Sequence, residues 1–216
     1  MKSPNLKLYQ SIIFDCDGVI LNSNKVKTKA FYDSAIEYGE DYAKELVEYH
    51  IANGGVSRYK KFEYLFEVIM RRDHIDTGEM EKVLNRYAEN VWEGLLDCDV
   101  AEGLVELRLL YPKSRWLIVS GGDQEELRKI FQVKGIDKYF DRGIFGSPDD
   151  KKLILEREVS SGNIKLPAIF IGDSQYDFEC AQHMKLDFIY LSKWSESKYD
   201  FKFAKAAKSD IYSLVF

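Results

Sequence analysis

Cysteine and histidine are scarce in this chain. Its 216 residues include three of each. Cys16, Cys98 and Cys180 are odd in number and far apart, and none belongs to a Cys-x-x-Cys pair. This pattern gives no support to a disulfide framework or a zinc site and is typical of a reducing compartment. The histidines are equally scattered, so we expect them to be surface or packed residues rather than metal ligands: His50, His74 and His183.

Long apolar runs and an excess of positive charge are also missing. No apolar stretch approaches the roughly 20 residues of a membrane helix. The net charge is −5, which argues against general nucleic-acid binding, because phosphate backbones bind to basic surfaces. Residues 1–7 lead into the first strand candidate without a signal peptide. We therefore expect a cytoplasmic protein that binds neither nucleic acid nor membranes, while the sequence predicts nothing about its oligomeric state.

The length and composition are those of one large globular domain, or of a domain with an insertion. After about residue 97, apolar runs at 116–119, 168–172 and 188–191, and a short one near Ile144, alternate with helix candidates at 101–110, 123–131, 150–159 and 176–184. This alternation predicts an α/β fold, with a Rossmann-like parallel sheet and helices on both faces. The segment 209–216 is compatible with a short strand or a last helical turn.

Between residues 22 and 95 every periodic segment is helical. Apolar side chains recur at helical spacing in two runs: Phe62, Leu65, Phe66, Ile69 and Met70, then Val83, Tyr87, Val91 and Leu95. The Asn53-Gly54-Gly55 segment separates two of these helices. The pattern predicts a core domain of residues 1–21 and 96–216 with an all-helical insertion at 22–95.

The segment Ser11-Ile-Ile-Phe-Asp-Cys-Asp-Gly18 is the most informative stretch. A short apolar strand delivers Asp15 and Asp17 to its end, and Gly18 allows a sharp turn. Acids next to a core need a compensating role, such as binding a cation or transferring protons. A calcium loop is excluded, because its fifth and twelfth positions are Val19 and Val26.

Three further segments place polar residues at the ends of apolar runs. Ser120 follows the run 116–119 and precedes Gly121 and Gly122, and Lys151 stands at the expected start of a helix. Asp173 follows the run 168–172, and Asp177 comes four residues later. Parallel strands end at the same edge of a sheet, so these side chains can converge with Asp15. Converging carboxylates predict a hard divalent cation, and Mg²⁺ fits best.

These four segments together resemble the haloacid dehalogenase-like hydrolase superfamily, most of whose members are magnesium-dependent phosphatases. The resemblance spans Asp15 to Asp177. It implies that Asp15 is the nucleophile that forms an aspartyl-phosphate, and that Asp17 protonates the leaving oxygen. It also implies that Asp15, Asp173 and the backbone carbonyl of Asp17 hold Mg²⁺, and that the helical insertion is a mobile cap.

The remaining candidates would hold the phosphate. Ser120 and the amides of Gly121 and Gly122 would bind its oxygens, at the start of a helix that Asp123 and Glu126 would cap. A lysine in the first turn of a helix opposes the macrodipole at a cost of about 0.3–1 kcal/mol. The attraction of Lys151 to the phosphate and to Asp15 would offset that cost. Lys152 is the alternative site lysine if the register slips by one. Asp177 is compatible with metal binding, directly or through a ligand, with pairing to Lys151, and with a plain first-turn helix acid.

The cap offers one candidate for substrate recognition, Arg58. Its segment, Gly55-Val-Ser-Arg58, resembles one in β-phosphoglucomutases, where the arginine contacts the non-transferring phosphate. A solvated arginine at a helix start is the alternative. Lys25 and Lys29 would share a helix face, which we expect to be solvated. The chain also departs from the mutases, with Lys27 in place of a histidine and Leu84 in place of a cap lysine.

The sequence thus predicts a Mg²⁺-dependent phosphatase that hydrolyses a small phosphorylated metabolite, above all a sugar phosphate. A phosphosugar mutase of the same superfamily is the first alternative. A catalytically idle binding module is the second, and the intact set of acids and lysine argues against it. Asp17 argues against carbon–halogen cleavage, because dehalogenase members lack this second aspartate.

Overall fold

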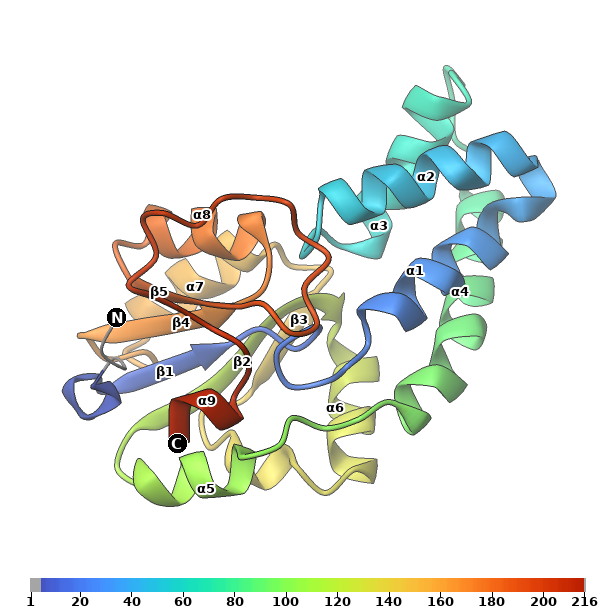
Figure 1. Cartoon of the computed structure of the whole chain (residues 1–216). Helices are drawn as coiled ribbons and strands as arrows, with labels where there is room; N and C mark the ends of the chain where they lie inside the picture. Colours follow the sequence, from blue (N-terminus) through green and yellow to red (C-terminus); the bar gives the residue numbers. More distant parts are fainter. Residues whose placement is uncertain (1–4, 216) are drawn as a thin grey trace.

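The computed structural model describes residues 5–215 and shows a parallel sheet of six strands flanked by helices (Figure 1). The strands are β1 (Ser11–Phe14), β2 (Arg115–Asp123), β3 (Ile144–Ser147), β4 (Ala168–Gly172), β5 (Asp187–Leu191) and β6 (Ala206–Lys208). Their order in the sheet is β3-β2-β1-β4-β5-β6. The α/β class and the parallel sheet predicted from the sequence are confirmed.

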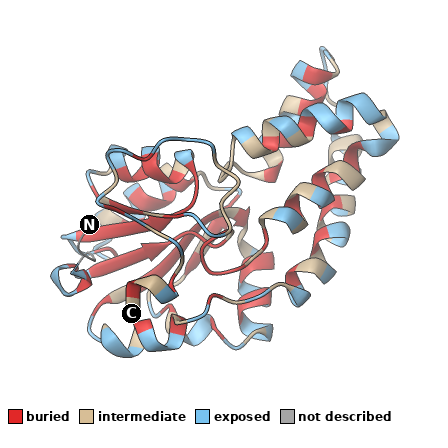
Figure 2. Cartoon of the chain, viewed as in Figure 1, coloured by how far each residue is buried: buried red, intermediate tan, exposed pale blue. Residues whose placement is uncertain are grey.

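Helices cover both faces of this sheet because its strands are apolar on both sides. Ile12 and Phe14 of β1 pack on one face, with α5 (Leu104–Leu110), α6 (Gln124–Val133) and α9 (Tyr212–Val215). Ile13, between them, packs on the opposite face with α7 (Lys151–Ser160) and α8 (Gln175–His183). All four residues of β1 are buried, as the red central strands of Figure 2 show. The first site segment is therefore fixed in the middle of the core.

Some elements differ from the prediction. β2 continues to Asp123, so Ser120, Gly121 and Gly122 lie at the end of a strand rather than in a loop. Helix α5 begins at Leu104 instead of residue 101, after Gly103 with its φ of +80°. β6 was not predicted, because three residues of sequence Ala-Ala-Lys have no apolar pattern. The C-terminal segment forms the helical turn α9, which is one of the two alternatives predicted for it, although Phe216 lies outside the described residues. Residues 1–4, on which the signal-peptide expectation partly rests, also lie outside them.

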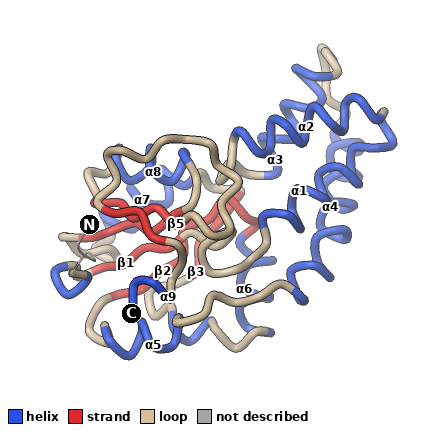
Figure 3. The backbone as a smooth tube through the Cα atoms, viewed as in Figure 1, coloured by secondary structure: helices blue, strands red, loops and turns tan. Residues whose placement is uncertain are grey.

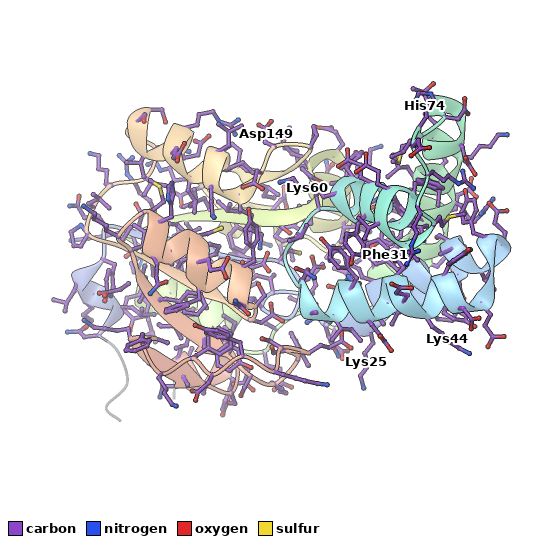
Figure 4. All side chains as sticks on the ribbon, turned by 90° about the horizontal axis from the view of Figure 1, so that it is seen from above. Lys25, Phe31, Lys44, Lys60, His74 and Asp149 are labelled. Atoms are coloured by element: carbon purple, nitrogen blue, oxygen red, sulfur yellow. The ribbon has the colours of Figure 1, made fainter. Side chains whose placement is uncertain are left out.

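The four remaining helices lie together beyond the carboxyl edge of the sheet (Figures 1 and 3). They are α1 (Asn24–Ala35), α2 (Glu40–Ala52), α3 (Arg58–Tyr64), which continues as a π-helix at Leu65–Ile69, and α4 (Thr77–Asp97). Their centre is aromatic: the ring of Phe31 lies 5.3 Å from that of Phe62 and 4.4 Å from that of Tyr87, between the helices in Figure 4. None of the helices in the described chain is long and apolar enough to cross a bilayer.

Candidate active site

The sheet register brings the predicted acids to one edge. Phe14, the last residue of β1, is paired with Ile118 of β2 on one side and Ile171 of β4 on the other. The next backbone amide, that of Asp15, donates a hydrogen bond to the Ile171 carbonyl at 2.9 Å. Asp15 and Asp173 therefore leave neighbouring strands at nearly the same level.

Three buried carboxylates, those of Asp15, Asp173 and Asp177, form a cluster in which one oxygen of each lies within 4.8 Å of the others. Burial, and then the charge of Asp177, raises the pKa of Asp15 to about 7. Burial, followed by the charges of Asp15 and Asp177, raises the pKa of Asp173 well above its usual value. Crowded carboxylates with raised pKa values are stabilised by a cation.

The donor set of this acidic cluster fits a hard divalent cation such as Mg²⁺. Every donor is a carboxylate oxygen, which is the ligand type that Mg²⁺ prefers. Oδ1 of Asp15 is buried and makes no hydrogen bond of regular geometry, although Nζ of Lys151 lies nearby. Asp17 does not belong to the cluster through its side chain. The expected backbone ligation by Asp17 stays a prediction.

Lys151 supplies the positive charge next to this acidic cluster. Its Nζ lies 2.9 Å from Oδ1 of Asp15 and 2.5 Å from Oδ1 of Asp177, and only 1% of its side chain is exposed. Burial alone would lower its pKa, but the charges of Asp15 and Asp177 raise it well above the usual value. These two ion pairs compensate for the unfavourable position of a lysine at the start of α7. Lys152 instead extends over the ring of Tyr176, at 5.6 Å from its centroid.

Asp177 has two structural roles besides its place in the acidic cluster. Its Oδ2 accepts hydrogen bonds from the backbone amide of Ser174 at 3.1 Å and from its hydroxyl at 2.7 Å, and Ser174 caps α8 in return. Its Oδ1 accepts from Lys151. Of the alternatives left open by the sequence, pairing with Lys151 is therefore present in the structure. Because α8 orients the carboxylate, Asp177 fixes the position of Lys151.

Asp17 points to a different set of partners, at the start of α1 and on its first turn. Its Oδ1 accepts a hydrogen bond from the hydroxyl of Ser23 at 2.6 Å, and its Oδ2 forms an ion pair with Nζ of Lys27 at 2.6 Å. Burial would raise the pKa of Asp17, but the charge of Lys27 holds it below the usual value. Sequence reasoning did not identify Lys27 as a site residue. The available signal was its position, where the mutases carry a histidine.

Gly18 is the residue that lets this turn fit against the acidic cluster. Its φ is +74°, and a Cβ at this position would lie 2.1 Å from Oδ2 of Asp173 and 2.5 Å from Nδ2 of Asn24. Asn24 in turn donates a hydrogen bond to Oδ2 of Asp173 at 2.7 Å. A side chain at position 18 would therefore displace Asp173 as well as strain the backbone.

The Ser120-Gly-Gly segment contacts the helical insertion as well as the core. Oγ of Ser120 is buried and accepts a hydrogen bond from the amide of Gly122 at 3.0 Å. A Cβ on Gly121 would lie 2.1 Å from the carbonyl oxygen of Gly55. Glycine at position 121 therefore allows the backbone of the helical insertion to approach the core. The expected contacts of Ser120 and Gly121 with phosphate stay predictions.

Arg58 is buried at the junction of α3 and α6. Its guanidinium forms an ion pair with Glu126 and lies 4.5 Å from the ring centroid of Tyr87. Asp123 caps α6 by accepting from the amide of Glu126 at 3.0 Å, whereas the carboxylate of Glu126 faces Arg58. The solvated arginine considered from the sequence is thus not what the structure shows.

The two residues after Arg58 also contact the core. The hydroxyl of Tyr59 donates to Oδ2 of Asp123 at 3.0 Å, and Nζ of Lys60 lies 2.8 Å from Oδ2 of Asp150. Figure 4 shows Lys60 on the side of α3 that faces the loop of Asp149. Three consecutive residues, 58–60, therefore hold the helical insertion against α6 and the start of α7.

A cavity of about 60 Å³ lies between the insertion and the sheet edge. We call it the active-site cavity; its lining includes Asp15, Asp17, Asp173, Lys27, Arg58 and Lys61. Lys61 and its neighbour His50 were not singled out from the sequence, where each looks like an ordinary helix residue. Lys25 and Lys29 are exposed, as expected, because their helix face is opposite to that of Lys27.

Comparisons with known proteins agree with this geometry. The family model for haloacid dehalogenase-like hydrolases matches residues 12–191. A phosphorylated carbohydrates phosphatase from Thermotoga maritima is 23% identical over 192 residues, which is 84% of each chain.

Solved structures share the fold. A β-phosphoglucomutase from Clostridium difficile has a TM-score of 0.77 at 16% identity, with 94% of this chain and 92% of that one covered. A protein described as a predicted phosphoglycolate phosphatase from Haemophilus somnus has a TM-score of 0.73 at 14% identity, with 96% and 97% covered. The family match covers most of the core, so the family expected from the four sequence segments is confirmed. The chain belongs to the haloacid dehalogenase-like hydrolase family.

Proposed function

We propose that this protein is a Mg²⁺-dependent phosphatase that hydrolyses a small phosphorylated metabolite, most simply a sugar phosphate, in the cytoplasm. The arrangement that carries the proposal is the acidic cluster of Asp15, Asp173 and Asp177, with Lys151 paired to Asp15 and Asp177. The carboxylate of Asp17 faces the same cavity and has its own partners on the insertion. The Thermotoga maritima relative, which is named for phosphorylated carbohydrates, supports the substrate class.

The residues of this site divide the reaction between them. A carboxylate oxygen of Asp15 attacks phosphorus, a bond forms between them, and the bond from phosphorus to the leaving oxygen breaks. Lys151 attracts the phosphoryl oxygens while Asp17 gives the leaving oxygen a proton. A bound Mg²⁺, held by Asp15, Asp173 and the backbone of Asp17, would supply further positive charge to the phosphoryl group.

The second half of the reaction uses the ionised form of Asp17. Lys27 and Ser23 stabilise this form, so the carboxylate can accept a proton from the water that attacks the aspartyl-phosphate. The water oxygen forms a bond to phosphorus, the bond from phosphorus to Asp15 breaks, and inorganic phosphate leaves. In the first half, the negative charge of the bound phosphate favours the protonated form of the same group. Lys27 thus acts as a positioning residue that keeps Asp17 turned to the cavity.

We also propose that residues 22–95 are a cap that opens and closes over the sheet edge. The contacts of residues 58–60 with α6 and α7 would define the closed position. The mutase alternative has less support, because Leu84 and Asn85 line an outer groove between α4 and α6 rather than the active-site cavity. An idle module has less support because the acids and Lys151 converge.

A screen of phosphorylated metabolites for phosphate release tests the function. We expect activity with Mg²⁺, no activity in excess chelator, and inhibition by Ca²⁺, whose larger radius and higher coordination number disturb the in-line geometry. Release of phosphate into solution separates a phosphatase from a mutase, which would return an isomeric phosphate ester. Full activity in chelator would show that the acidic cluster is not a metal site.

Arg58→Ala should weaken turnover of the preferred metabolite by about 1–3 kcal/mol in kcat/KM, the range for a lost charge-assisted contact. A small aryl phosphate should be hydrolysed nearly as by the unmodified protein, because it offers nothing for Arg58 to bind. Steady-state kinetics with both substrates measure the difference. Equal loss with both would indicate structural damage instead.

Glu126→Gln is the matched control for Arg58. If Arg58 acts only by holding the cap against α6, this variant should reproduce the loss, because it removes the charge that pairs with the guanidinium. If Arg58 contacts the substrate, Glu126→Gln should retain most of the kcat/KM. Wild-type kinetics for both substrates in Arg58→Ala would contradict both roles.

A further inference from the structure

A buried lysine and histidine face the active-site cavity from the cap. Nζ of Lys61, on α3, lies 2.7 Å from Nδ1 of His50, on α2, and both side chains line the cavity that contains Asp15 and Asp17. The exposed fractions are 2% for Lys61 and 8% for His50. The phosphatase mechanism above gives neither residue a role.

Lys61 differs from the other cap cations in the same cavity. Lys27 is paired with Asp17, and Arg58 with Glu126. Within residues 5–215, Lys61 forms no ion pair with a carboxylate, and its polar partner is His50, itself a base. The ring of Phe31, with its centroid 5.3 Å from Nζ, offers only a cation–π contact. A buried amine without an acid is costly to charge unless a ligand provides the counter-charge.

We propose that Lys61 and His50 form a subsite for a second anionic group, a carboxylate or a phosphate, on the substrate whose phosphomonoester reacts at Asp15. An ammonium at Lys61 donates one N–H to His50 Nδ1, which leaves two N–H groups for an anion. With Nδ1 as acceptor, the neutral imidazole carries its proton on Nε2, a further donor. This inference deepens the proposed function and rests on it for the position of the reacting phosphate.

The charges around Lys61 are compatible with such a ligand. Burial, and then the positive charge of Lys27, lowers the pKa of Lys61 to about 7, against the opposing effect of Asp17. Lys151 lowers it further and Asp15 raises it. Burial and the charge of Lys61 also hold the pKa of His50 well below its usual value. Without a ligand, the Lys61 amine can therefore release its proton near neutral pH at little cost in free energy. A bound anion would favour the protonated, charged amine.

Matched substrate pairs test the subsite. Phosphoglycolate has a carboxylate where 2-hydroxyethyl phosphate has a neutral hydroxymethyl group, and fructose 1,6-bisphosphate has a second phosphate that fructose 1-phosphate lacks. In each pair, we call the substrate that carries the additional anionic group the second-anion member. We expect its kcat/KM to be about tenfold or more above that of the other member in at least one pair, mainly through a lower KM. The pair that shows the preference identifies the anion as carboxylate or phosphate.

Variants assign the preference to Lys61. Lys61→Met, which keeps the shape and removes the charge, should bring the ratio within the responsive pair close to one, and Lys61→Arg should restore part of it. Lys44→Met is the control and should keep the wild-type ratio, because Lys44 is 59% exposed, pairs with Glu40 on α2, and projects outward in Figure 4. The same loss in Lys44→Met would contradict the assignment to Lys61.

Binding separates this inference from the proposed function. Calorimetry on the Asp15→Asn protein should show about tenfold tighter binding of the second-anion member of the responsive pair, and Lys61→Met should remove that difference. If the wild-type protein hydrolyses no phosphate ester but Asp15→Asn shows this binding preference, the phosphatase proposal is contradicted and the subsite is kept. If proteins that retain Lys61 hydrolyse and bind the two members of each pair equally well, the subsite is overturned, whether or not Lys61→Met folds.

Discussion

Asp15→Asn should reduce phosphate release to less than about one-thousandth of the wild-type rate, a barrier increase of about 4 kcal/mol. An amide cannot attack phosphorus, and the near-isosteric change leaves the packing of β1 undisturbed. Phosphate release with the preferred metabolite measures the effect. Beryllium fluoride should bind to Asp15 of the unmodified protein as a mimic of the phosphorylated state. A metal-dependent complex with that ion on Asp173 would reverse the roles of the two acids.

The same change should stabilise the protein when no metal is bound. The pKa of Asp15 in the folded protein, about 7, is above its ordinary value of 3.8. Proton binding by the Asp15 carboxyl therefore contributes to the free energy of unfolding in full below pH 3.8, and this contribution is lost as the pH rises to 7. In chelator, Asp15→Asn should therefore raise the free energy of unfolding by about 1–4 kcal/mol above pH 7 and by less near pH 5. Urea unfolding at both pH values measures this. A lower stability of Asp15→Asn at pH 8 would contradict the charge crowding that we infer.

The predictable part of this fold is the part that is local in sequence. β1 and β4 are unbroken apolar runs that end in acids, so the sequence alone places Asp15 and Asp173 at strand ends. Their convergence follows from parallel pairing alone. β6, in contrast, has no apolar run, and it exists because it pairs with β5 at Ile189 and Ala206.

The residues that sequence reasoning missed depend on how the cap lies on the core. Lys27 and Lys61 look like solvated helix lysines in a chain rich in charge, but both are buried at this contact. Arg58 and Glu126 are 68 positions apart, so no local pattern could pair them. Gly121 was expected to bind phosphate, and the structure adds that its missing side chain leaves room for the carbonyl of Gly55. Long-range contacts of this kind require the tertiary structure.

Lys151→Met should have the opposite effect on stability to Asp15→Asn. The cluster has three buried acids, and Lys151 pairs with two of them. Removing a negative charge therefore relieves repulsion, while removing Lys151 leaves Asp15 and Asp177 unpaired. Breaking a buried ion pair from one side costs about 3–5 kcal/mol, and we expect this loss in the metal-free protein. Turnover should fall at least about 100-fold, because the phosphoryl group loses its neutralising cation. Chemical unfolding in chelator and phosphate-release kinetics with Mg²⁺ measure the two effects.

Lys152→Met is the matched control, one residue further along the same helix. Among the described residues, 5–215, the one contact recorded for the side chain of Lys152 is the cation–π contact with Tyr176, so its loss should cost less than about 1 kcal/mol and leave turnover nearly unchanged. Mg²⁺ should recover part of the stability of Lys151→Met, because a cation among the three acids replaces some of the missing charge. Combining Lys151→Met with Asp15→Asn should also recover part of it, since one unpaired acid is removed. If Lys151→Met is as stable as Lys152→Met in chelator at pH 8, Lys151 does not neutralise Asp15 and Asp177 in the folded protein, and the electrostatic basis of the proposed metal site is wrong.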